Sequence, residues 1–136
     1  MRAAIIDVDW LGWVTFGDHV RLMAANLGAV WANFAAAGSE YAVMARMMLS
    51  RSELDALRAA VPDLDITVVR VESPPDLVRS RLERRDTGAI LEHHLVQSAE
   101  YSMVVGGLGL EDLVVSNDDR PIRALADEVL DRLGWV

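Results

Sequence analysis

The stretch Ile66-Thr67-Val68-Val69-Arg70-Val71 (residues 66–71) decides the fold. It is dominated by β-branched residues, which favour strands because their stiff side chains pack well on a pleated surface. Apolar side chains fall at both odd and even positions, so the strand needs cover on both faces. A strand buried on both faces is typical of a parallel sheet that lies between helices. The stretch therefore predicts an interior strand of an α/β protein.

Helices and strands are predicted to alternate on either side of this strand. Further strands are expected at 3–8, 41–45 and 112–115, and helices at 18–38, 50–62, 74–85, 88–105 and 121–134. Asp18 is a candidate N-cap, and Ser50 with Glu53 has the spacing of a capping box. Strict alternation favours right-handed crossovers and a parallel sheet. We predict one α/β domain over 1–136, a three-layer parallel sheet of about four strands.

Composition excludes several classes of function. The chain has 136 residues, 52% of them hydrophobic, which suits one compact domain with a real core. With 21 acidic and 13 basic residues the net charge is -8, so a nucleic-acid partner is not expected. Cysteine is absent and no long apolar span is evident, which predicts a cytoplasmic protein without a membrane partner. All thirteen basic residues are arginine.

Two carboxylates follow the first predicted strand. Asp7 and Asp9 are expected at the carboxyl edge of the sheet, where open α/β folds bind ligands. Together they could hold Mg²⁺ through water. The alternative is that both are solvated residues that cap a turn. Trp10 and Trp13 follow at once and are interpreted as packing or interface residues.

Three arginines lie on neighbouring turns of the helix that follows Pro74. Arg81, Arg84 and Arg85 could bind phosphate or sulfate, because the guanidinium fork matches an oxyanion. The alternative is a solvated face that pairs with nearby acidic residues. The adjacent histidines His93 and His94 point about 100° apart on a helix and are interpreted as surface residues.

Two long stretches carry a family resemblance. The sequence ITVVRVESPPDLVRSRLERRDTG (66–88), a helix, and LVVSNDDRPIRALADEVLDRLGW (113–135) resemble the C-terminal half of small P-loop kinases of the adenylylsulfate, gluconate and shikimate kinase kind. The resemblance implies that Arg81, Arg84 and Arg85 are lid arginines. It implies an adenine-binding loop formed by Ser116, Asn117, Asp118, Arg120 and Pro121. It also places Asp7 and Asp9 at the end of the family's second strand, as catalytic residues that handle magnesium and the acceptor substrate.

The sequence departs from that family at its defining motif. The loop G-x-x-x-x-G-K-[ST], whose amides and lysine hold the phosphates, does not occur in residues 1–136, and no lysine is present to supply its cation. The chain looks like such a kinase that begins at its second strand, without the first strand, the P-loop and the first helix. In the family the strand order is 2-3-1-4-5, so the missing strand is the central one.

These observations predict a degenerate or truncated P-loop-kinase-like protein without a working ATP phosphate site. It retains an acceptor pocket for a small anionic ligand, and if it is active it is a small-molecule phosphotransferase. No metal ligands are assigned and no cofactor is expected, because ATP and Mg²⁺ would need the missing loop. The expected partner is a second copy in a homodimer, which would cover the incomplete sheet. The alternatives are a non-catalytic homo-oligomeric binding module and a fragment of an active kinase whose P-loop lies upstream.

Overall fold

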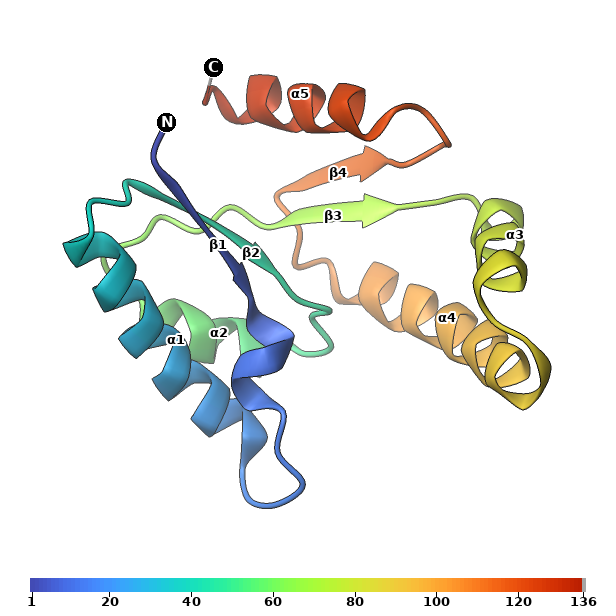
Figure 1. Cartoon of the computed structure of the whole chain (residues 1–136), viewed down its shortest axis with the longest axis horizontal. Helices are drawn as coiled ribbons and strands as arrows, with labels where there is room; N and C mark the ends of the chain where they lie inside the picture. The colour runs from blue at the N-terminus through green and yellow to red at the C-terminus, as the bar shows by residue number, and fades with distance from the viewer. Residues whose placement is uncertain (136) are drawn as a thin grey trace. The chain divides into compact units, whose positions relative to one another are not determined.

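The structure, a computed structural model, describes residues 1–135 and divides into two compact units (Figure 1). The first unit is residues 1–66 and the second begins at Thr67. Each unit contains two parallel strands and the helices that connect them. None of the helices within residues 1–135 is long and apolar enough to cross a membrane.

The first unit is a two-stranded parallel sheet with its connecting helices. Its elements are β1 (Ala3–Asp7), the 3-10 helix η1 (Val8–Gly12), α1 (His19–Ala36), β2 (Tyr41–Ala45) and α2 (Arg51–Ala60). In the register, Ile5 of β1 lies beside Val43 of β2. Both predicted N-caps are present, since Asp18 accepts from the Arg21 amide at 3.0 Å and Ser50 Oγ accepts from the Glu53 amide at 3.2 Å. The caps fix where α1 and α2 begin.

The core of the first unit lies on one face of its sheet. The strand β1 alternates exposed and buried residues, so Ala4 and Ile6 point inward. The buried core consists of Ile6, Val8, Met23, Leu27, Leu57 and Val61. On the other face Ile5 is 82% exposed and its neighbour Val43 is 48% exposed. The helices α1 and α2 therefore cover one face of this sheet and leave the other open.

The second unit repeats this plan with a longer connection. Its elements are β3 (Val69–Glu72), α3 (Pro75–Arg85), α4 (Gly88–Leu108), β4 (Leu113–Ser116) and α5 (Ile122–Leu133). The strands β3 and β4 pair in parallel, with Val71 beside Val115. Val115 and Leu125 of α5 are buried, whereas α4 has no fully buried residue. An apolar helix of 21 residues that buries no side chain completely is an unusual feature of this unit.

The α/β prediction is confirmed, and the strands form two parallel pairs. Within residues 1–135, β1 pairs with β2 and β3 pairs with β4, and no ladder joins β2 to β3. The finer prediction, a three-layer sheet of four strands, is not shown by these two pairs.

Two predicted element boundaries are wrong. The third strand begins at Val69 rather than Ile66, because Ile66 packs against the core of the first unit and the Val68 amide donates to the Asp112 side chain at 2.8 Å. The helix α4 continues to Leu108 and ends at Gly109, whose φ of 58° is the left-handed conformation that closes a helix.

Candidate functional site

Asp7 ends β1 and caps the 3-10 helix that follows. Its Oδ1 accepts from the Asp9 amide at 3.1 Å, which starts η1. This contact is the turn-capping role that we weighed as the alternative to metal binding. Among residues 1–135 the structure shows no group of three or more His, Cys, Asp or Glu side chains that could hold a metal ion. A catalytic role for Asp7 stays a prediction.

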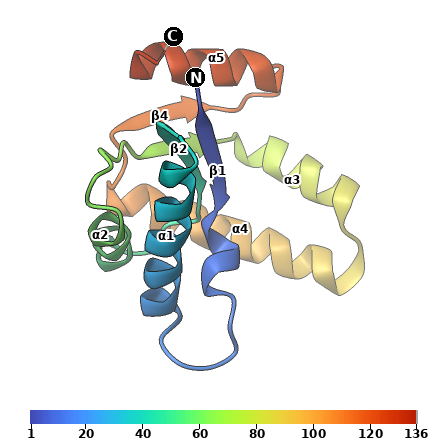
Figure 2. The ribbon, with the colours of Figure 1, turned by 60° about the vertical axis from the view of Figure 1, so that its left-hand side comes forward.

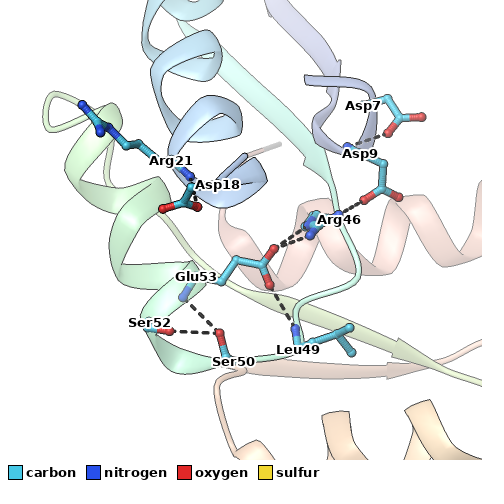
Figure 3. Close-up of polar contacts among 9 residues, drawn as sticks. All are labelled: Asp7, Asp9, Asp18, Arg21, Arg46, Leu49, Ser50, Ser52 and Glu53. Carbon is cyan, nitrogen blue, oxygen red and sulfur yellow. Dashed lines mark hydrogen bonds and ion pairs between the residues drawn. The ribbon is translucent and has the colours of Figure 1, made fainter. Parts of the chain in front are cut away.

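Asp9 belongs to a charged cluster that the sequence did not reveal (Figure 3). Arg46, one residue beyond β2, lies between two carboxylates and pairs with Asp9 through Nη1 and with Glu53 through Nη2. Its Nε also donates to Glu53 Oε1 at 2.9 Å. Parallel strands end at the same edge of a sheet, so β1 and β2 deliver Asp9 and Arg46 to one place. We call Asp9, Arg46 and Glu53 the arginine bridge.

Glu53 is the most buried member of the arginine bridge. The residue is 4% exposed and comes from the first turn of α2, where Ser50 caps its amide. Its second oxygen, Oε2, accepts from the Leu49 amide at 3.3 Å. The capping-box spacing predicted the Ser50 half of this contact. It did not predict that the glutamate would turn to Arg46. The only signal in the sequence was an arginine directly after the predicted strand 41–45.

The arginine bridge is held by charge. Burial opposes the positive charge of Arg46, but the bonds to Asp9 and Glu53 outweigh burial and raise the pKa of Arg46 above its usual value. Because two carboxylates face one guanidinium, the three groups together carry a net negative charge. The carboxylate of Asp9 is thus engaged by Arg46.

In the second unit, Arg81 reaches the loop that follows β4. Its Nη2 donates to Asn117 Oδ1 at 3.1 Å and to Asp119 Oδ1 at 3.4 Å, and its Nη1 donates to Ser73 Oγ at 3.2 Å. The family resemblance implied that Arg81 is a lid arginine and that Asn117 belongs to an adenine-binding loop. In the structure these two residues are in direct contact.

Arg84 and Arg85 lie apart from that contact. Arg85 pairs with Asp86 at 2.8 Å, as the alternative of a paired face predicted. Arg84 is exposed, and no bond to it is present within residues 1–135. The three arginines therefore do not converge on one anion site.

Asp86 joins α3 to α4 through a second ion pair. His94 Nδ1 lies 2.7 Å from Asp86 Oδ2. The bond from Arg85, with that from His94, lowers the pKa of Asp86 to about 2. The sequence analysis interpreted His94 as a surface residue. Its ring is partly exposed, and its contact with Asp86 links α4 to the residue that follows α3.

Arg120 orders the loop from Ser116 to Pro121. Its Nη2 donates to the Ser116 carbonyl at 2.8 Å, and its Nη1 pairs with Glu128 of α5 at 2.5 Å. The Arg120 bond lowers the pKa of Glu128 below its usual value. Asp118 lies 3.4 Å from Arg120 Nε, and Pro121 opens α5. All five predicted adenine-loop residues thus lie together in a loop stabilised by its own arginine.

Comparison of the chain with protein-family models, with curated proteins and with solved structures finds no match.

We predict that Glu53→Gln destabilises the first unit. The variant keeps the shape of the side chain but removes the charge that compensates partly buried Arg46, so the free energy of unfolding should fall by about 1–2 kcal/mol. Urea denaturation followed by far-ultraviolet circular dichroism measures the change. Glu40→Gln is the matched control, because the Glu40–Arg2 pair is exposed and should contribute little. Equal effects of the two variants would contradict the importance of the arginine bridge.

The Asp86 ion pairs should make the second unit sensitive to acid. The folded-state pKa of about 2 lies below the value near 3.9 of an unfolded aspartate, so folding favours the ionised form. The stabilisation is therefore present above about pH 4 and is lost as the pH falls toward 2. Denaturation of the wild type and of Asp86→Asn across this range should show stabilities that converge at low pH. A difference that is constant with pH would argue against the ion pairs.

Proposed function

We propose that this chain is a P-loop-kinase-like module that does not bind ATP phosphates by itself and whose divided sheet is completed by another polypeptide. The observation that carries the proposal is the strand pairing, β1 with β2 and β3 with β4. In the family that the sequence resembles, these would be the second, third, fourth and fifth strands, in the order 2-3-1-4-5. The strand that carries the phosphate-binding loop would lie between β2 and β3, where the pairing is interrupted.

The charges support a module without a working phosphate site. Residues 1–136 hold no lysine and no G-x-x-x-x-G-K-[ST] loop, the parts that hold β- and γ-phosphates in P-loop enzymes. The residues expected at the acceptor and lid positions are also occupied, since Asp9 pairs with Arg46 and Arg81 bonds to Asn117. Arg84 remains as a contact for a small anionic ligand.

The exposed apolar surface supports a second polypeptide. Ile5 and Val43 lie side by side on the open face of the first sheet, and Val71 of β3 is also exposed. Within residues 1–135 no ladder joins β2 to β3, and a strand from another polypeptide would fit at this interruption.

A second copy of the chain is the partner that we favour. It offers the same exposed apolar face, so the two sheet faces can meet in a symmetric dimer. A segment upstream of these residues that carries a P-loop strand would fit the same interruption. An in-frame G-x-x-x-x-G-K-[ST] in the upstream DNA distinguishes this alternative.

We expect residues 1–136 to show no saturable binding of Mg-ATP in calorimetry at micromolar protein and millimolar nucleotide. The reason is the lack of a lysine and of a backbone nest for the phosphates. Binding at micromolar nucleotide, or transfer of phosphate to any acceptor, would refute the proposal of an inactive nucleotide site.

We expect the protein to sediment as a dimer at micromolar concentration, and Ile5→Glu to shift it toward monomer. A buried glutamate on the open face would cost more than the apolar contact that it replaces. Ala32→Glu is the control, because it adds the same charge at an exposed position of α1, the helix packed on the opposite face of the sheet. If the wild type instead sediments as a well-folded monomer, the expectation of a dimer is wrong and the chain covers its own sheet.

A further inference from the structure

Three aromatic side chains on η1 and the loop that follows it are exposed. Trp10 is 67% exposed, Trp13 is 72% exposed and Phe16 is 79% exposed. The rings of Trp10 and Trp13 contact each other, with centroids 4.7 Å apart and planes tilted by 46°. The loop that carries Phe16 projects beyond the start of α1 (Figure 2). We call these three residues the aromatic platform.

The backbone beneath the platform is firmly anchored. Val8, two residues before Trp10, is fully buried in the core, and Leu11 packs against that core. Asn26 of α1 donates to the Leu11 carbonyl at 2.7 Å. At Gly12 an added Cβ would lie 2.8 Å from Cβ of Met23, so η1 and α1 touch closely. The tryptophans are thus held outward by a rigid support, which lowers the entropy lost when a partner binds.

The segment that carries the platform is acidic, although Arg46 from outside the segment pairs with one of its carboxylates, that of Asp9. Residues 7–18 contain Asp7, Asp9 and Asp18 and no basic residue. Asp7 and Asp18 accept only backbone amides among the bonds described for residues 1–135, so no cation neutralises them. Exposed aromatic rings on a segment that also carries the carboxylates of Asp7 and Asp18 are complementary to an organic cation.

We propose that the aromatic platform is the docking site for an arginine-bearing peptide segment of a partner protein. Guanidinium planes stack on tryptophan faces and are weakly hydrated, so they suit this surface better than a compact ammonium. Nucleobases also stack on tryptophan, but the acidic flank and the net charge of -8 repel a phosphate backbone. The same charge opposes adsorption to an anionic lipid surface.

The test is an NMR titration of the intact chain with an acetylated and amidated tetra-arginine peptide. The indole Nε1–H signals of Trp10 and Trp13 should shift saturably, while those of Trp31 and Trp135 serve as internal references and stay in place. Binding should weaken as salt is added. A Trp10→Ala/Trp13→Ala variant should bind about tenfold or more weakly, which corresponds to the loss of two ring contacts.

Two further variants distinguish the contribution of the aromatic platform to binding from general effects of substitution on folding. Asp7→Asn/Asp18→Asn keeps the capping oxygens but removes both charges, and it should weaken binding even if the tryptophan variant folds poorly. Ile122→Ala removes an equally exposed apolar side chain of α5 and should leave binding unchanged. Absence of saturation, equal affinity of the Asp7/Asp18 variant, equal affinity for tetramethylammonium, or tighter binding of oligothymidine or lipid vesicles would overturn the proposal.

Discussion

A pair of parallel strands has two apolar faces, and the helices of each crossover here bury only part of them. In the first unit α1 and α2 pack on Ile6, and this packing leaves Ile5 and Val43 on the open face. Larger parallel sheets solve the problem with helices on both sides. Two strands alone give a small core, so each unit places much of its apolar surface outside. The exposed sheet face follows from this constraint.

The charged side chains form ion pairs within each unit. Arg46 compensates the charge of the buried Glu53 carboxylate and also pairs with the carboxylate of Asp9. A buried glutamate without such a partner would be costly, so the arginine bridge is first a solution to burial. In the second unit Arg81 and Arg120 bind the loop after β4 in the same manner. The arrangement orders the segments that follow the strands.

The aromatic platform differs from the other exposed apolar surface because its support is rigid and its surroundings are charged. The exposed face of β1 and β2 is plain aliphatic surface, which suits another sheet or helix. Trp10 and Trp13 instead belong to residues 7–18, a segment with three aspartates and no basic residue. The two surfaces thus differ in chemistry, and for this reason we propose different partners for them, a second polypeptide for the sheet and a cationic side chain for the rings.

The sequence by itself determined the local structure. Periodicity, caps and glycine stops indicated the helices and strands, and Asp18 and Ser50 cap where their chemistry predicted, because these preferences depend on neighbours within a few residues. It also determined that no lysine can hold a phosphate. Only the tertiary structure decided that Arg46 meets Glu53 and Asp9, that Arg81 closes on Asn117 while Arg84 and Arg85 turn elsewhere, and that four strands form two pairs. Those outcomes depend on which strands pair and on which charged side chains lie close together in the folded chain. Such contacts join residues that are distant in the sequence, so they leave no periodic pattern in it.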